Sequence, residues 1–309
     1  RALGQCDFDY ECPPQGSDVE NNPLETFPNP RNTNGFIHCS HGIAYCKDCA
    51  ATYPGTPALV WDDTKKQCER SVACDLLATS KWSACSKLCD GGTRQRTTTC
   101  SHLGSPITCN KCTNGKDVEI EACNTWSCPK CRRQVDIGLL LDSSGSIKEW
   151  DVVANAAAEF TEVMQNQDVS IQIGVVIFAS DSAVVKSLNE PVTVDEIRTL
   201  KRTDGGTATS IGLNTMGQQI FNTANGDRPS AQNVVVVFTD GASDSATQTI
   251  SAAQKLKNSG IEIYSVGVEN ANLRELEQMS SDAGHVFYTN NIRDLTEALY
   301  GALKAICPD

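Results

Sequence analysis

The sequence predicts a doubly wound α/β domain with a mostly parallel sheet over residues 131–309, preceded by two small, disulfide-rich, β-containing modules over 1–75 and 76–130. Two observations support this prediction. Fourteen of the sixteen cysteines lie before residue 129, as expected of small modules that bury too little apolar surface to fold without cross-links. After Cys131, short apolar runs alternate with segments of helical periodicity, which is the pattern of parallel strands covered by helices on both faces.

The strands of the C-terminal domain are predicted from its apolar runs. Residues 135–141 form a run that ends at a turn, and residues 233–238 are too continuously apolar for a strand with one solvated face. Residues 182–186 follow another run so closely that a hairpin at the edge of the sheet is expected. The remaining strands are expected at 170–178, 261–268 and 285–288.

The helices between these strands are predicted from apolar residues that recur every three or four positions. They are expected at about 153–164, 210–221, 250–256 and 295–306. Ligands of doubly wound folds bind at the carboxyl ends of the strands, near the point where the strand order reverses. The loops that follow the strands are therefore where a functional site is expected.

The composition indicates the compartment in which the protein acts and disfavours some classes of partner. The formal charge of −12 disfavours nucleic acid as a partner. No run of about 18 apolar residues is present, so no membrane span is expected. The cysteine density predicts a secreted protein in an oxidising, extracellular compartment. The chain begins at Arg1 without an apolar leader, so we expect a mature or trimmed protein.

Zinc binding is the alternative interpretation of the cysteines. Cys46 and Cys49 form one pair with the spacing of metal ligands, and Cys109 and Cys112 form another. However, the chain has only four histidines, and the two pairs lie in different cysteine-rich modules. Disulfide bonds are therefore favoured.

Three loops of the C-terminal domain carry oxygen ligands at the expected edge of the sheet. They are residues 142–146 after the first strand, 205–209 at the start of a helix, and 239–241 after the strand at 233–238. The candidate ligands are Asp142, Ser144, Ser146, Thr207 and Asp240. Carboxylates and hydroxyls suit Mg²⁺, Ca²⁺ or Mn²⁺, whereas zinc is disfavoured because neither Cys nor His is offered. The simpler alternative is a set of polar turns that cap helices.

This set of residues resembles the metal-ion-dependent adhesion site of von Willebrand factor A domains and integrin inserted domains. The family pattern is Asp-x-Ser-x-Ser, then a Thr, then an Asp. The resemblance implies direct contact of the two serines with the cation, and contact of Asp142 mainly through water. Thr207 and Asp240 would bind directly or through water. A partner's carboxylate is expected to fill a remaining coordination position, although a site that binds metal without a metal-dependent ligand is also open.

The ends of this domain carry the last two cysteines. Cys131 precedes the first strand and Cys307 follows the last helix. Because the ends of a compact domain often lie close together, a disulfide between them is expected. Pairing of Cys131 with an upstream cysteine is the alternative.

Residues 76–130 are similar to a thrombospondin type 1 repeat, on the segments Trp82–Cys85, Cys89–Arg96 and Cys123–Pro129. The resemblance implies stacking of Trp82 on Arg96, with Arg94 less certain. Thr79 stands where the family's first Trp would be, and Leu88 stands where an O-fucosylated Ser or Thr usually lies. Both a matrix or glycan contact and a rigid spacer remain possible. The implied disulfides join Cys85 to Cys123, Cys89 to Cys128, and Cys100 to Cys109 or Cys112.

Residues 1–75 resemble a divergent peritrophin-type chitin-binding module, with an altered cysteine pattern. Its aromatic side chains could stack on sugar rings, or they could form the small core of the module. These candidates are Phe36, Tyr45, Tyr53 and Trp61. This module and the next each hold seven cysteines. A disulfide between the two modules is therefore expected, through Cys74 or Cys46.

The modules together predict a non-enzymatic matrix or adhesion protein that binds collagen, chitin or both. No Gly-x-Ser-x-Gly, His-Glu-x-x-His or Walker motif is present, which disfavours an enzyme. The module order resembles secreted matrix proteins of invertebrates, including shell and byssal-thread proteins. The alternatives are a soluble recognition protein of innate immunity and a metal-binding structural linker without a metal-dependent ligand.

Overall fold

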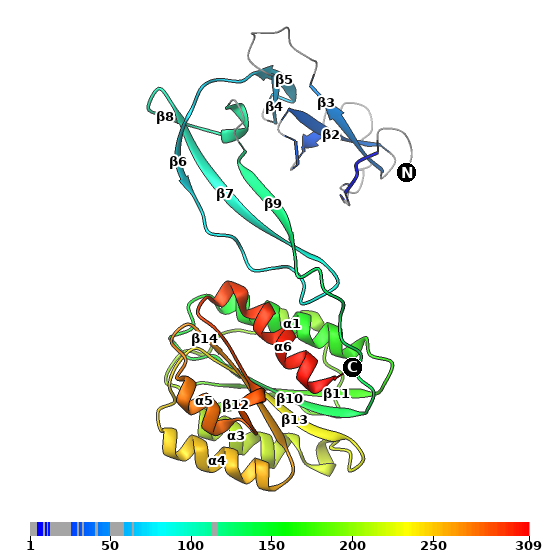
Figure 1. The fold of residues 1–309 in the computed structure, drawn as a ribbon, viewed down its shortest axis with the longest axis vertical. Coiled ribbons are helices and arrows are strands. Elements are labelled where there is room, and N and C mark those ends of the chain that lie inside the picture. Colours follow the sequence, from blue (N-terminus) through cyan, green and yellow to red (C-terminus); the bar gives the residue numbers. More distant parts are fainter. Residues whose placement is uncertain are drawn as a thin grey trace. The chain divides into compact units, whose positions relative to one another are not determined.

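The computed structural model divides into two compact units (Figure 1). One unit comprises residues 1–83 and 94–121, and the other comprises residues 84–93 and 122–309. Within the chain, the structure describes every residue except 1–4, 9, 11, 13–25, 30, 33, 41–42, 50–58, 64, 113–115 and 309. The two units do not coincide with the three modules expected from the sequence, because the second module contributes to both.

The larger unit is built on a six-stranded sheet with the order β12-β11-β10-β13-β14-β15. All neighbouring strands run parallel except β12, which pairs antiparallel with β11 at the edge. The expected doubly wound α/β fold and its hairpin edge are confirmed. The strands are β10 (Val135–Asp142), β11 (Ile171–Phe178), β12 (Ser182–Lys186), β13 (Gln232–Thr239), β14 (Glu262–Val268) and β15 (Val286–Thr289).

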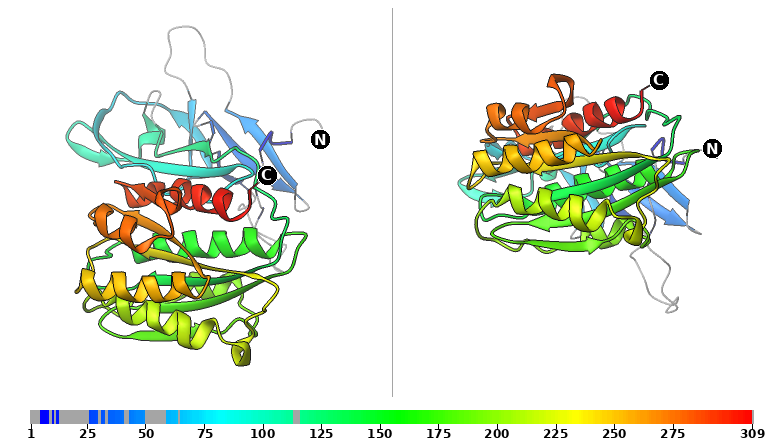
Figure 2. Two further views of the ribbon diagram at one scale, coloured as in Figure 1. Left: turned by 60° about the horizontal axis from the view of Figure 1, so that its bottom comes forward. Right: turned by 90° about the horizontal axis from the view of Figure 1, so that it is seen from below.

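Helices cover both faces of this sheet (Figure 2). The core on one face joins β10 to α1 (Trp150–Gln165), α2 (Val194–Arg198) and α6 (Leu295–Ile306). The core on the other face joins the sheet to α3 (Thr209–Thr215), α4 (Ala246–Asn258) and α5 (Leu273–Met279). All eight residues of β10 are buried between the two cores, which explains the absence of alternation in that strand.

Short elements complete the connections. The helix expected at 210–221 is shorter, because α3 ends at Thr215 and the chain continues as a π-helical turn, η2 (Met216–Ile220). The five-residue α2 and seven-residue α5 are too short to be recognised from periodicity. The 3₁₀ turns are η1 (Cys109–Lys111), η3 (Thr223–Asn225), η4 (Ala283–His285) and η5 (Ile292–Asp294).

Residues 84–93 and 122–130, which we call the tip, extend one core of the larger unit. Leu88 of the tip is completely buried in the core that contains α1 and α6. The buried Asn124 donates from Nδ2 to Thr296 Oγ1 on α6 at 3.1 Å. The ring of Trp126 lies 5.0 Å from the ring of Tyr300 on α6. The tip, which the sequence assigns to the second module, is therefore packed as part of the α/β unit.

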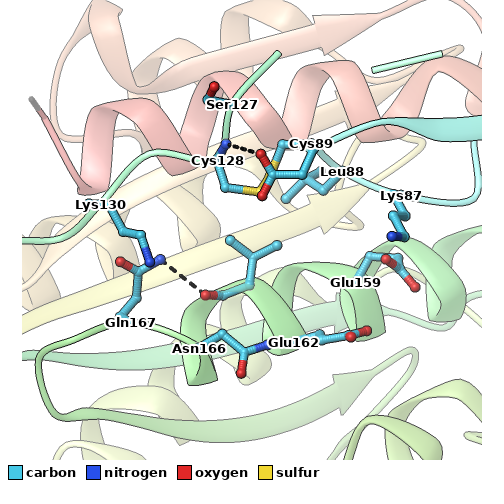
Figure 3. A pocket seen from close by; sticks show the side chains of 12 residues that line it. Lys87, Leu88, Cys89, Ser127, Cys128, Lys130, Glu159, Glu162, Asn166 and Gln167 are labelled. Carbon is cyan, nitrogen blue, oxygen red and sulfur yellow. Dashed lines mark hydrogen bonds between the residues drawn. A yellow bond between two sulfur atoms is a disulfide. The ribbon is translucent and has the colours of Figure 1, made fainter. Parts of the chain in front are cut away.

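A pocket lies beside this contact, between the tip and α1 (Figure 3). The Cys89–Cys128 disulfide and Leu88 line it from the tip, and Glu159 lines it from α1. At its lower rim, Gln167 donates from Nε2 to the Pro129 carbonyl at 3.2 Å and accepts from the Cys131 N–H at 2.8 Å. These hydrogen bonds of Gln167 fix the end of the tip near Pro129, whereas the buried Leu88 side chain anchors the tip in the core.

The Trp126→Phe substitution tests the polar part of this contact. Trp126 donates from Nε1 to the Leu88 carbonyl at 3.2 Å, whereas phenylalanine keeps an aromatic ring but loses this donor. The free energy of unfolding of the α/β unit should fall by about 1 kcal/mol, the usual contribution of one hydrogen bond. Urea unfolding of the whole chain measures this change. An unchanged midpoint would show that the bond contributes nothing.

The smaller unit contains most of the second module. Its strands are β6 (Asp75–Thr79), β7 (Gly92–His102), β8 (Ser105–Ile107) and β9 (Val118–Cys123), and the long β7 pairs with each of the others. Trp82 receives two cation–π contacts, with Arg96 at 4.6 Å and Arg94 at 5.5 Å. Arg94 therefore joins the stack that the resemblance implied for Arg96. These contacts replace a hydrophobic core in this thin sheet.

The N-terminal module forms two small sheets. One contains β1 (Thr26–Pro28), β2 (Gly35–Ser40) and β3 (Ile43–Asp48), and the other contains β4 (Leu59–Asp62) and β5 (Gln67–Arg70). Asp62 is 1% exposed and forms an ion pair of 2.7 Å with Lys111 of the second module. The two modules thus meet within one compact unit, through a buried charge.

All sixteen cysteines are paired in disulfides. Cys74 and Cys112 form the bond between the first two modules, whereas Cys46 pairs with Cys6 inside the first. All four cysteines of the two pairs with metal-like spacing are bonded to other cysteines, so the zinc alternative is not supported. The other bonds are Cys12–Cys39, Cys49–Cys68, Cys85–Cys123, Cys89–Cys128, Cys100–Cys109 and Cys131–Cys307.

Candidate metal centre

The candidate ligands lie at the topological switch point of the sheet. From β10 the chain continues to β11 on one side, and β13 later pairs with the other side of β10. Asp142 is the last residue of β10, and Asp240 directly follows β13. Because adjacent parallel strands end at the same edge, their carboxylates are brought together there.

Four of the five predicted ligands form one chain of polar contacts. Ser146 Oγ donates to Asp240 Oδ1 at 2.6 Å, and the hydroxyls of Ser144 and Ser146 lie 2.9 Å apart. Ser144 N–H in turn donates to Asp142 Oδ1 at 2.9 Å. The hydroxyls of Ser144 and Ser146 and the Asp240 carboxylate thus lie at contact distance, and the Ser144 N–H joins Asp142 to them.

Thr207 lies on the second loop, which is bonded to the first. Gly145 N–H donates to the Gly205 carbonyl at 3.2 Å, and Asp204 N–H donates to the Ser143 carbonyl at 3.0 Å. Gly205 has a φ of +103°, and a Cβ there would lie 2.6 Å from Ser180 Oγ, so only glycine fits. Thr207 itself is 9% exposed. These contacts place Thr207 on a loop that lies directly against the loop of Ser144.

Burial dominates the electrostatics of this edge. Asp142 is fully buried, and this burial raises the pKa of its carboxyl. Hydrogen bonds from Ser144 and Thr239 lower that pKa, and the charge of Asp240 raises it again. No lysine or arginine of the described residues forms an ion pair with either carboxylate. Two neighbouring carboxylates without a cationic partner repel each other, and a bound cation would offset this repulsion.

The donor set fits a hard divalent cation. It consists of carboxylate and hydroxyl oxygens, which Mg²⁺, Ca²⁺ and Mn²⁺ accept. In the part of the chain that the structure describes, this edge included, no group of three or more His, Cys, Asp and Glu residues could hold a metal ion. The hydroxyls are therefore an essential part of this candidate site, which acidic residues alone would not form.

Two contributors to this edge were not assigned from the sequence. Thr239 donates from Oγ1 to Asp142 Oδ2 at 2.7 Å and thereby orients that carboxylate. Asp244 accepts a hydrogen bond at Oδ1 from Thr207 N–H at 3.0 Å. Thr239 precedes Asp240 directly and Asp244 follows it by four residues, but contacts between loops depend on how the strands pair.

The candidate sugar-binding residues of the first module have different surroundings. Trp61 is 4% exposed and stacks on Phe36, with ring centroids 4.4 Å apart. Its ring therefore packs inside the module, as expected of the alternative in which these aromatic side chains form a small core. Tyr45 is half-buried on β3, and Tyr53 lies outside the described residues.

Among the described residues, no helix is long and apolar enough to cross a membrane.

Proteins of the extracellular matrix are similar to this chain. Human matrilin-1 is 28% identical over 249 residues, which cover 76% of this chain and 47% of matrilin-1. Human matrilin-4 is 29% identical over 58% of this chain and 30% of its own length. The collagen alpha-1(XII) chain of Notophthalmus viridescens is 28% identical over 56% of this chain and 20% of its own. The chain thus spans less than half the length of each of these relatives.

Solved structures of a mussel byssus protein share the fold. Proximal thread matrix protein 1 superposes with a TM-score of 0.54 and 26% identity, over 58% of this chain and 49% of that protein. A second structure of the same protein, with zinc in its MIDAS motif, superposes with a TM-score of 0.53.

Family models match two parts of the chain. The thrombospondin type 1 domain model matches residues 78–128, in agreement with the resemblance of the second module. The von Willebrand factor type A domain model matches residues 136–300. This second match spans more than half of the 309 residues, and the chain therefore belongs to the von Willebrand factor type A domain family.

Proposed function

We propose that the chain is a secreted, non-enzymatic adhesion protein of the extracellular matrix. In this proposal the A domain, residues 131–309, binds a divalent cation and uses it to bind a matrix protein such as collagen. The similarity to matrilins and to the collagen alpha-1(XII) chain supports the compartment and the class of partner.

The observation that carries the proposal is the chain of contacts from Asp142 through Ser144 and Ser146 to Asp240. Ser144 and Ser146 would hold the cation directly, and Asp142 would act mainly through water. Thr207 and Asp240 would complete the set directly or through water. When bound, the cation supplies a Lewis-acidic contact for a carboxylate of the partner, because two protein carboxylates leave coordination positions open.

The identity of the cation is a separate part of the proposal. Mg²⁺ fits best, because it favours oxygen ligands and keeps exchangeable positions, and Ca²⁺ or Mn²⁺ are the alternatives. The lack of Cys and His among the proposed ligands disfavours zinc, but the mussel protein holds zinc in its MIDAS motif. Zinc therefore belongs among the cations to be compared.

The proposal does not extend to chitin. Of the four aromatic candidates in the first module, Trp61 and Phe36 stack on each other, with Trp61 almost completely buried. If this pair forms the core of the module, its two rings are not offered to a sugar, and the main reason to expect chitin binding is lost.

Binding to immobilised collagen, measured with Mg²⁺ and again with EDTA, tests the proposed function. We expect binding in Mg²⁺ and its loss in EDTA. The Asp142→Ala variant should weaken cation binding about 10- to 100-fold, as removal of an indirect ligand does. Asp195→Ala is the matched control, because its side chain is 88% exposed on α2.

Two other outcomes would favour the alternative functions. Binding that persists in EDTA would indicate a structural linker whose metal is not used for adhesion. EDTA-sensitive binding that is confined to soluble glycoproteins would favour a recognition protein of innate immunity.

A further inference from the structure

Asp244 lies beside the cation site without belonging to the proposed ligand set. It is located in the loop between β13 and α4, four residues after Asp240. The N–H and the carbonyl of Thr207 both form hydrogen bonds with Asp244. Asp244 Oδ1 accepts from Thr207 N–H at 3.0 Å, and Asp244 N–H donates to the Thr207 carbonyl at 2.9 Å. One residue of the third loop therefore fixes the backbone of the second loop at its proposed ligand.

The neighbouring glycine shows how closely the carboxylate lies against this loop. A Cβ at Gly206 would lie 2.7 Å from Asp244 Oδ2 and 3.2 Å from Oδ1. Gly206 N–H donates to Ser180 Oγ at 2.8 Å, on the opposite side of the loop. The second loop is thus held between Ser180 and Asp244.

The segment that carries Asp244 is itself anchored to α5. Glu275, which is 6% exposed, accepts hydrogen bonds from both the N–H and the hydroxyl of Ser243. Thr249 Oγ1 donates to Ser243 Oγ at 2.9 Å. No lysine or arginine of the described residues forms an ion pair with Glu275. The hydrogen bonds of this buried carboxylate therefore fix Ser243, the residue that precedes Asp244.

We propose that Asp244 is a positioning residue that sets the place of Thr207 in the cation site. This inference rests on the proposed function, because it assumes that Thr207 serves the cation. Asp244 would act through its two hydrogen bonds to the Thr207 backbone, and its negative charge would contribute little. Residues that orient ligands without touching the metal commonly affect metal affinity.

Three variants separate positioning from charge. Asp244→Ala removes the acceptor and should weaken Mn²⁺ binding about 10-fold, the lower end of the range for such residues. Asp244→Asn keeps an oxygen that can accept from Thr207 N–H, and should bind Mn²⁺ within about 2-fold of the natural chain. Asp195→Ala is again the matched control, because Asp195 is an exposed carboxylate on α2 that does not contact Thr207. It should also leave binding unchanged.

Calorimetric titration with Mn²⁺ measures these affinities, and the amide resonance of Thr207 in the metal-free protein reports its hydrogen bond. This resonance should move in Asp244→Ala and remain in place in Asp244→Asn. The double variant Thr207→Ala/Asp244→Ala should bind Mn²⁺ no more weakly than Thr207→Ala alone, because both changes remove one contribution.

The outcomes distinguish this inference from the proposed function. Equal weakening by Asp244→Asn and Asp244→Ala would overturn positioning and indicate an effect of charge. Fully additive losses in the double variant would also overturn it. Absence of Mn²⁺ binding in the natural chain would instead remove the proposed function itself. The unfolding midpoint of each variant verifies that it is folded.

Discussion

Leu88→Ala should lower the free energy of unfolding of the α/β unit by about 2–5 kcal/mol, the range for leucines removed from well-packed cores. The residue belongs in sequence to the thrombospondin-like repeat, yet its side chain is completely buried in the core beside α1 and α6. Shortening it removes apolar contacts and leaves a cavity under the tip. The same substitution would have a small effect if the tip only touched the domain surface.

Urea unfolding followed by far-UV circular dichroism measures this effect, because every α-helix of the described chain lies in the larger unit. Leu103→Ala is the matched control, since Leu103 is 89% exposed in the same repeat. It should change the free energy of unfolding by less than about 0.5 kcal/mol. Equal midpoints for the two variants would show that the tip is not part of the domain core.

Saturating Mg²⁺ should stabilise the same unit by about 2.7 kcal/mol at a free concentration 100 times the dissociation constant. The melting temperature should rise by roughly 5–11 °C, because 1 kcal/mol corresponds to roughly 2–4 °C for a domain of this size. The physical reason is that only the folded state binds the cation, which offsets the repulsion between the carboxylates of Asp142 and Asp240. EDTA should return the melting temperature to its starting value.

The double variant Ser144→Ala/Ser146→Ala should abolish this rise, because it removes the two hydroxyls that lie between the carboxylates. Ser230→Ala/Ser259→Ala is the matched control. These exposed serines precede β13 and β14, at the amino ends of the strands and hence the opposite edge of the sheet. The control should keep the full rise. A rise of equal size in both double variants would place the stabilising cation elsewhere.

The sheet could be predicted well because its strands are buried on both faces. A continuously apolar run such as 233–238 is expected in a strand that is buried on both faces. The observed strand β13 extends only one residue beyond this run at each end. The helices were predicted less accurately. The periodicity of 210–221 continues through the π-helical turn after Thr215, so an apolar stripe alone did not reveal the change of helix type.

The ligand loops could be predicted because their residues follow strands directly, where parallel topology brings them to one edge. Asp244 and Thr239 could not be assigned a role in this way, because their partners are set by contacts between loops. Leu88 was recognised only as a departure from the thrombospondin-repeat pattern. A single leucine in a polar module has no periodicity, so its burial against α1 and α6 could not be predicted from the sequence.

In the proposed site, a divalent cation is held by the loops at 142–146 and 239–241, which follow β10 and β13, and by the loop at 205–209, which precedes α3. Anomalous X-ray diffraction from crystals grown with Mn²⁺ tests it most directly. We expect one strong peak at about 2.0–2.6 Å, the range of divalent cation–oxygen distances, from the hydroxyls of Ser144 and Ser146. We expect no such peak in the Ser144→Ala/Ser146→Ala variant. A peak that persists in this variant, or a natural chain without a peak at these hydroxyls, would contradict it.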